Sequence, residues 1–256
     1  MSKTRRRFIS KSPKTSGPTA RERSRENYYE DRRQRSWTYH DLAPIQPLTV
    51  AQQYMLNIFD DGYNLVAYGS AGTGKTFMAL CLALNEILDP QSKTNNITLV
   101  RSAVQTRDMG FLPGTLEEKI ALYETPYRDI LYEIVGKYSS YDDMKQAGLI
   151  QFCTTSFLRG LTWNNSLVII DEGQNMTFHE INSVLTRLGE NSRLIFLGDI
   201  TQGDLLKRKQ ETTGMDRFLR IAAKIESIRM VEFNQDDIVR SRFVKEWIIA
   251  TEDTPE

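Results

Sequence analysis

The stretch GSAGTGKT at residues 69–76 decides the fold, because it fits the pattern G-x-x-x-x-G-K-[ST]. It follows the apolar run NLVAYG (64–69) and opens the helical pattern KTFMALCLALNEIL (75–88). A strand, a glycine-rich loop and a helix in this order predict a phosphate-binding loop, in which backbone N–H groups and the helix N-terminus face phosphate oxygens. A glycine-rich turn without a ligand is the alternative. The predicted binding residues are Gly69, Ser70, Ala71, Gly72, Thr73, Gly74, Lys75 and Thr76.

Two side chains of this loop have specific expected roles. Lys75 is a compact cation suited to the β- and γ-phosphates, and the Thr76 hydroxyl is suited to Mg²⁺. The loop therefore predicts that the chain binds a nucleoside triphosphate, for which ATP is the expected ligand.

Short apolar runs recur along the rest of the chain and alternate with helical patterns. Continuous apolar runs predict strands covered on both faces, and their alternation with helices predicts a parallel sheet. The expected fold class is therefore α/β and doubly wound. In the pattern at 178–189, the residues Ile181, Val184, Leu185 and Leu188 share one helical face, and Gly189 is the expected helix end. Besides 64–69, the runs are 96–102, 149–155, 166–171, 193–199 and 228–233.

The run SLVIIDEGQNM (166–176) ends on adjacent carboxylates rather than on ordinary turn residues. An ATPase needs an acid at the tip of a strand next to the loop strand, and Asp171 is expected there, holding Mg²⁺ through its water shell. Glu172 is expected to activate the attacking water. A solvated acid near a helix start is the alternative for Glu172. Gln174 and Asn175 are interpreted as coupling residues between this site and a bound polynucleotide.

A third strand ends in LGDITQ (197–202), and its tip is expected to face the same crevice. Gln202 carries both a donor and an acceptor, which suits detection of a γ-phosphate or a water. Asp199 is interpreted either as part of the site or as a turn residue.

The charge of the 256 residues is unevenly spread. Residues 1–46 hold 12 Lys and Arg against 5 Asp and Glu, a balance of +7, whereas the whole chain is neutral. Residues 1–46 also contain few aliphatic residues, so they have little apolar surface to bury. This predicts a disordered basic arm at 1–46, followed by one domain at 47–256. Contact with nucleic acid and a solvated tail are both open for the arm, whose aromatics Tyr28, Tyr29, Trp37 and Tyr39 are interleaved with arginines.

The remaining composition excludes several classes of protein. Cys81 and Cys153 are expected to be free thiols, and His40 and His179 are too scattered for a metal cluster. No apolar run approaches the roughly 18 residues of a membrane span, so no membrane contact is expected. A cytoplasmic location is the default expectation.

Several further motifs occur together and in a fixed order. They resemble the PhoH-like family of P-loop ATPases, which is related to the first RecA-like domain of superfamily 1 helicases, and the resemblance implies a phage or bacterial member. The resemblance extends over 47–250 and implies a RecA-like, mainly parallel sheet. The motifs are MGFLPGTLEEK (109–119), PYRDILYE (126–133), FLRGLTW (157–163), IIDEGQNMT (169–177), LTRLG (185–189), GDITQGDL (198–205) and DIVRSRFV (237–244).

The resemblance implies roles for individual residues. Gln52 matches an adenine reader, Gln202 a γ-phosphate sensor, and Asp171 with Glu172 the Walker B pair. Arg240 matches an arginine finger that stabilises transition-state charge, either in cis or from a neighbouring subunit. For three further arginines the family positions leave phosphate contact, nucleic-acid contact and a structural salt bridge open: Arg101, Arg159 and Arg187.

The sequence also departs from the family pattern. Gly173 stands where alanine is usual, and Ile200 where proline is usual. Leu161 replaces an arginine and Ser241 a histidine, which puts in doubt any shared polynucleotide contact at these two positions.

Together these features predict a Mg²⁺-dependent ATPase coupled to RNA or single-stranded DNA. A helicase closes its ATP cleft with a second RecA-like domain, for which this chain has no room. A homo-oligomer is therefore expected, such as a hexameric ring. A nucleotide-gated binding module with slow hydrolysis is the main alternative. A nucleotide kinase or GTPase is disfavoured because the sequence contains no Asn/Thr-Lys-x-Asp motif for guanine.

Overall fold

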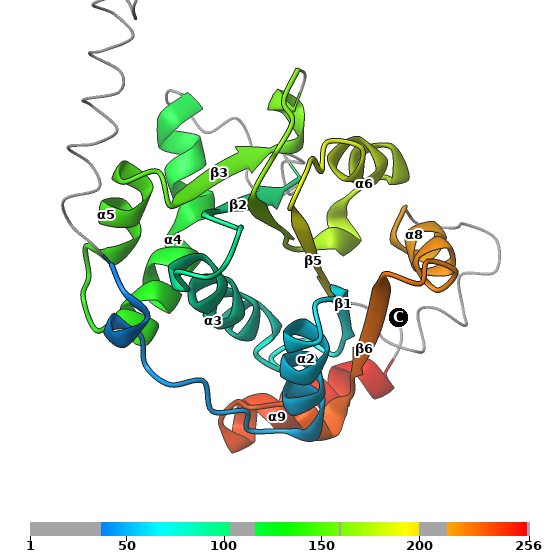
Figure 1. The fold of residues 1–256 in the computed structure, drawn as a ribbon. Helices are drawn as coiled ribbons and strands as arrows, with labels where there is room; N and C mark the ends of the chain where they lie inside the picture. The colour runs from blue at the N-terminus through cyan, green and yellow to red at the C-terminus, as the bar shows by residue number, and fades with distance from the viewer. Residues whose placement is uncertain (1–36, 103–115, 159, 200–213, 255–256) are drawn as a thin grey trace, which may run out of the picture. The chain divides into compact units, whose positions relative to one another are not determined.

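The computed structural model describes residues 37–102, 116–158, 160–199 and 214–254. Within them, six parallel strands form one sheet in the order β3-β2-β4-β5-β1-β6 (Figure 1). The α/β class with a parallel sheet is confirmed. The strands are β1 (Asn64–Gly69), β2 (Asn96–Arg101), β3 (Ile150–Thr154), β4 (Ser166–Ile170), β5 (Arg193–Asp199) and β6 (Ile228–Phe233).

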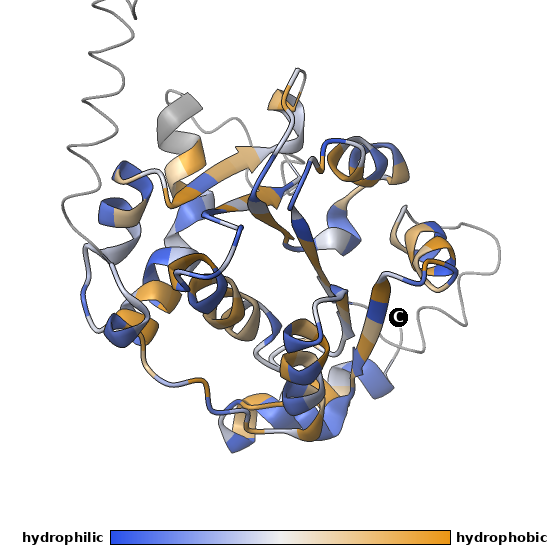
Figure 2. Ribbon diagram, viewed as in Figure 1, coloured by the Kyte–Doolittle hydropathy of each residue, from blue (hydrophilic) through white to orange (hydrophobic). Residues whose placement is uncertain are grey.

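Helices cover both faces of the sheet, so the core has two layers (Figure 1). Successive side chains of a strand point to opposite faces. Leu65 accordingly joins the layer under the helices that lie between residues 50 and 146, and Val66 joins the layer under the helices between residues 178 and 222. Figure 2 shows hydrophobic residues, in orange, along the strands, and both hydrophobic and hydrophilic residues on the helices. The described helices are α2 (Val50–Asp60), α3 (Lys75–Leu88), α4 (Leu116–Val135), α5 (Ser140–Gln146), α6 (Phe178–Leu185), α8 (Gly214–Ala222) and α9 (Arg242–Asp253).

The strand order corrects one expectation. The strand that ends before Asp171 is β4, and it is not adjacent to the loop strand β1, because β5 lies between them. In the register of the sheet, Gly69 at the end of β1 pairs with Asp199 at the end of β5. Because all three strands are parallel, their carboxyl ends meet at one edge of the sheet. This edge brings together the loop, Asp171 and Asp199.

The second helical pattern is shorter than predicted, since α6 ends at Leu185 rather than continuing to Leu188. Leu188 instead forms a parallel bridge with Trp163. A Cβ atom at Gly189 would lie 2.0 Å from Oδ1 of Asn164. Close approach to a neighbouring segment, and not a helix end, therefore requires the glycine.

The described residues 37–46 belong to the same compact unit as the sheet, although composition placed the start of the domain at residue 47. Trp37, Leu42 and Ile45 pack against the core layer that contains α2 to α5. The backbone N–H of Ala43 also donates to the carbonyl of Ile134 at 2.8 Å. Three apolar residues of this segment, which contains no Lys or Arg, are thus enough to attach it to the body. The rest of the predicted arm lies outside the described residues.

Candidate active site

The phosphate-binding loop connects β1 to α3, as the sequence predicted. Gly69 ends β1 with φ of 127°, and a Cβ atom there would lie 1.9 Å from the carbonyl oxygen of Phe233. The N–H of Ser70 donates to the same carbonyl at 2.9 Å. Gly74, with φ of 79°, is the residue before the first turn of α3. Only glycine fits these two positions without strain, so the backbone path of the loop is set by its residue types.

Lys75 is buried within this loop, with 6% of its surface exposed. Its Nζ donates to the carbonyl of Ser70 at 2.7 Å and to the hydroxyl of Thr73 at 3.1 Å. It also forms an ion pair with Oδ1 of Asp199 at 2.8 Å. A buried cation requires such a counter-charge. Asp199, for which the sequence left two interpretations open, therefore contacts the central lysine of the loop.

Asp171 and Thr76 meet where β4 ends and α3 begins. The Thr76 hydroxyl donates to Oδ1 of Asp171 at 3.1 Å, and the hydroxyl of Tyr127 donates to Oδ2 at 2.8 Å. Asp171 is buried, with 5% of its surface exposed. A hydroxyl beside a carboxylate is an oxygen donor set that suits Mg²⁺, so these residues fit the predicted metal.

Glu172 lies one residue beyond, with a left-handed backbone at φ of 56° and ψ of 41°. Its Oε2 accepts a hydrogen bond from the Gln174 amide at 2.7 Å, and its Oε1 lies 3.5 Å from Nη2 of Arg101. Burial and the neighbouring Asp171 raise the pKa of Glu172, while Arg101 opposes the rise. A carboxylate with a raised pKa is a stronger proton acceptor than an ordinary glutamate.

Gln174 links the ends of two strands. Its Nε2 donates to Glu172 beyond β4, and its Oε1 accepts from the N–H of Asp199 at the end of β5. Through Asp199 this chain of contacts continues to Lys75. The adjacent Gly173, where the family usually has alanine, lies against Phe196. A Cβ atom at Gly173 would be 2.2 Å from the Phe196 ring, which accounts for the glycine.

Gln52, the predicted adenine reader, lies behind the loop in α2 and is 3% exposed. Its Oε1 accepts from the N–H of Leu48 at 2.7 Å, and its Nε2 donates to the carbonyl of Thr73 at 2.9 Å. Both halves of the amide thus have protein partners here. An adenine contact through this amide requires at least one of them to be exchanged.

Of the remaining predicted residues, one lies beside the loop, one makes structural contacts, and two lie outside the described residues. Arg240 is exposed, and its Cγ lies 3.1 Å from the place of a Cβ on Gly72. Arg187 donates to the carbonyls of Leu158 and Ser183, so its described contacts are structural. Gln202 and Arg159 lie outside the described residues, as do the departure at Ile200 and most of the motif at 109–119.

The site lies in a cleft of about 640 Å³. Sequence reasoning did not single out Tyr127, although it lies in the quoted motif PYRDILYE; a tyrosine in a helix carries no signal of a contact with Asp171. The described cleft residues are Gln46, Leu48, Gln52, Gly72, Thr73, Gly74, Lys75, Thr76, Phe77, Met78, Arg101, Pro126, Asp129, Ile130, Glu133, Asp171, Glu172, Gln174, Leu197, Gly198, Asp199, Val239 and Arg240.

Among the described residues, no group of three or more His, Cys, Asp or Glu side chains is arranged to hold a metal ion. No helix among the described residues is both long and apolar enough to cross a membrane. Cys81 and Cys153 are both free, and burial raises the pKa of Cys81 to about 12.

Comparison with known proteins identifies relatives over most of the chain. The family described as PhoH-like protein matches residues 44–252. A PhoH-like protein of Mycobacterium tuberculosis (strain H37Rv) is 34% identical over 80% of this chain and 57% of its own length. A PhoH-like protein of Synechocystis is 37% identical over 72% of this chain and 55% of its own. Protein PhoH of Escherichia coli K12 is 34% identical over 78% of this chain and 56% of its own length.

The chain thus spans somewhat more than half the length of these relatives. Among solved structures, the Sulfolobus solfataricus SWI2/SNF2 ATPase core in complex with dsDNA covers 74% of this chain and 45% of its own, with 13% identity and a TM-score of 0.40. A structural similarity this weak carries no argument. The family match and the sequence identities, together with the loop and the adjacent acids, show that the chain belongs to the PhoH-like family.

Proposed function

We propose that the chain binds ATP with Mg²⁺ and hydrolyses it, and that hydrolysis is coupled to RNA or single-stranded DNA. The observation that carries the hydrolysis is the meeting of four side chains at one edge of the sheet. Lys75 and Thr76 open α3, while Asp171 and Glu172 follow β4. A phosphate-binding cation, a metal-binding pair and a proton acceptor are the groups that triphosphate hydrolysis requires.

Each residue has a defined part in this proposal. Lys75 and the backbone N–H groups of the loop bind the phosphates. Thr76 and Asp171 would hold Mg²⁺, which neutralises phosphate charge. Glu172 accepts a proton from the water whose oxygen attacks the γ-phosphorus, and the bond to ADP breaks. Gln202 senses the γ-phosphate.

Two further residues complete the proposed site. Gln52 reads the adenine after its amide releases Leu48 or Thr73. Arg240, exposed at the rim of the cleft, stabilises the transition-state charge, either within one subunit or across to a neighbour.

Replacement of Glu172 tests the hydrolysis. Glu172→Gln keeps the shape of the side chain but cannot accept the proton. We expect ATP turnover to fall by about 10²–10⁴-fold, while ATP affinity stays within a few-fold of wild type. The control is Glu226→Gln, an exposed glutamate shortly before β6. A Glu172→Gln variant that retains full turnover would refute the assignment.

The coupling to a polynucleotide is supported by the basic composition of the N-terminal arm. The test compares ATPase rates with and without RNA and single-stranded DNA, for the full chain and for a shortened chain that starts at Trp37. Trp37 is the appropriate start because residues 37–46 pack on the body. Stimulation of the full chain alone would assign the contact to the arm. Equal stimulation would assign it to the body, and no stimulation of either would refute the coupling.

A homo-oligomer such as a ring is proposed because a second wall would complete the nucleotide cleft. Beside the cleft, α9 presents the exposed side chains Phe243 and Trp247, and Ile248 of the same helix lies near Gly72 of the loop. The size of the protein in solution, measured with and without ATP, tests this. A monomer under both conditions would contradict it.

The free thiols of Cys81 and Cys153 suit a reducing compartment, and we propose that the protein is located in the cytoplasm.

A specific observation favours the alternative, a nucleotide-gated binding module with slow hydrolysis. Lys75 is paired with Asp199, and both oxygens of Glu172 have protein partners. A site whose groups are engaged with one another must rearrange before it turns over. In such a module Glu172→Gln changes how long nucleic acid stays bound after ATP is added, more than it changes the already slow turnover.

A further inference from the structure

The carboxylate of Asp171 receives one hydrogen bond on each oxygen. Thr76, the other residue of the predicted metal site, donates to Oδ1, and Tyr127 donates to Oδ2. None of the ion pairs among the described residues involves Asp171. The two hydroxyls are therefore the side-chain donors that determine how this buried carboxylate is turned.

Packing determines the position of the Tyr127 ring. Tyr127 comes from α4, far from Asp171 in the sequence, and its side chain is completely buried. Its ring lies 6.1 Å from that of Phe152, and the guanidinium carbon of Arg101 lies 6.0 Å from the ring centroid. A ring held by its neighbours presents its hydroxyl at a fixed point, without loss of side-chain entropy when it donates.

A carboxylate rotates about the bond to its Cβ unless a partner holds one of its oxygens. A donor fixed on Oδ2 selects the rotamer in which Oδ1 accepts from Thr76. We propose that Tyr127 is a positioning residue that holds the Asp171 carboxylate in the orientation required for a divalent metal bound with the nucleotide. The inference rests on the proposed function, and it adds a residue from a helix outside the loop and the strand ends.

The expected effect concerns metal affinity and not the framework of the fold. Tyr127→Phe keeps the buried ring and removes one hydroxyl. Asp171 then samples orientations that turn Oδ1 away from Thr76. We expect the Mg²⁺ concentration that half-saturates nucleotide binding to rise about tenfold, the scale of one hydrogen bond to a charged acceptor. Nucleotide binding in the absence of Mg²⁺ should stay unchanged, because the contacts of Tyr127 are with Asp171, Phe152 and Arg101 and not with the phosphate-binding loop.

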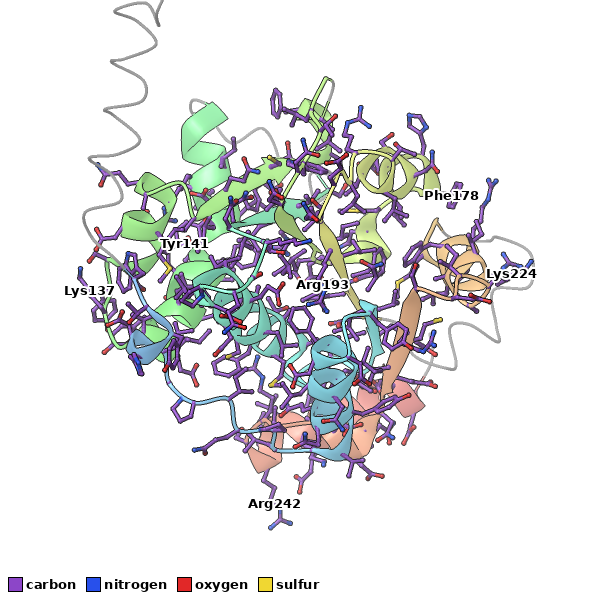
Figure 3. All side chains as sticks on the ribbon, in the orientation of Figure 1. Lys137, Tyr141, Phe178, Arg193, Lys224 and Arg242 are labelled. Carbon is purple, nitrogen blue, oxygen red and sulfur yellow. The ribbon has the colours of Figure 1, made fainter. Side chains whose placement is uncertain are left out.

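Tyr141 provides a matched control. It is also a completely buried tyrosine, in α5, and an arginine, Arg128, lies over its ring at 5.0 Å. Figure 3 labels it among the packed side chains, and it is not among the described residues that line the cleft. Tyr141→Phe thus removes a buried tyrosine hydroxyl without touching Asp171.

The experiment titrates Mg²⁺ into the full chain with a fluorescent ATP analogue, before hydrolysis is measured. Thermal unfolding of the wild type, Tyr127→Phe and Tyr141→Phe is recorded first, and binding is measured where all three are folded. A higher Mg²⁺ requirement in Tyr127→Phe alone would support the assignment. An unchanged requirement, or an equal rise in Tyr141→Phe, would overturn it while the proposed function stood. Nucleotide binding by the wild type that ignores Mg²⁺ would overturn both.

Discussion

The ammonium group of Lys75 lies 2.8 Å from a carboxylate oxygen of Asp199, the last residue of β5. The pairing follows from the register of the sheet, in which Asp199 stands beside Gly69 at the start of the loop. An internal carboxylate therefore contacts the cation that the proposed function assigns to a phosphate. ATP and Asp199 should compete for Lys75.

Replacement of Asp199 tests this competition. Asp199→Asn removes the charge, so nucleotide no longer has to displace an ion pair. We expect ATP to bind about two- to fivefold tighter, in keeping with the ~0.5–1 kcal/mol of a partly exposed pair. The nucleotide-free variant should also be less stable, because buried Lys75 loses its counter-charge. Calorimetric titration and thermal unfolding measure the two effects.

The charge control for this variant is Asp61→Asn, which removes an exposed acid after α2. Weaker ATP binding by Asp199→Asn, with Asp61→Asn unchanged, would show that Asp199 assists the nucleotide instead of competing with it.

Gln174 should couple the proton acceptor to the loop. Gln174→Ala removes both the donor to Glu172 and the acceptor for the Asp199 N–H. Glu172 then loses one of its two partners, and we expect turnover to fall about tenfold while ATP affinity changes less, since the phosphate contacts remain. Steady-state kinetics separate these quantities. The control is Gln53→Ala, an exposed glutamine of α2 outside the cleft, and equal losses in both variants would contradict a specific role for Gln174.

The pH dependence of catalysis should report on Glu172. A protonated Glu172 cannot accept a proton, so kcat/KM should decrease as the pH falls through its pKa. Because burial and Asp171 raise that pKa, the decrease should occur above the ordinary glutamate pKa of about 4.3. Arg101→Gln removes the cation that opposes the rise, so the acidic limb should move to higher pH. With exposed Arg220→Gln as control, a limb that stays in place or moves to lower pH would refute this link.

The contact between Gly173 and Phe196 predicts a coupled effect on stability. Gly173→Ala places a methyl group 2.2 Å from an atom of the buried Phe196 ring, so the two groups overlap. We expect this change to lower the free energy of unfolding by about 1–3 kcal/mol. Phe196→Leu leaves room for that methyl group. The double variant should therefore be more stable than the sum of the two single effects predicts. Denaturant unfolding measures all four chains, and strict additivity would show that the contact relaxes without cost.

Patterns that are local in the chain were predictable. The six apolar runs became the six described strands with ends that differ by at most one residue, and α3 begins and ends where its pattern does. The glycines of the loop and the adjacent acids at 171–172 were recognisable because their residue types reflect backbone geometry and chemistry at the same position. Their functional roles stay predictions.

The partners of these residues depended on contacts between distant segments. The insertion of β5 between β1 and β4 places Asp199 on Lys75, and strand order has no local signal. Tyr127 reaches Asp171 from a helix packed on the sheet, and the attachment of residues 37–46 depends on a surface that exists only once the helices have assembled. The sequence by itself determined the strands, the loop and the identity of the reactive groups, because periodicity and backbone requirements act over a few residues. The tertiary structure alone decided which groups meet, because long-range packing sets the distance between them.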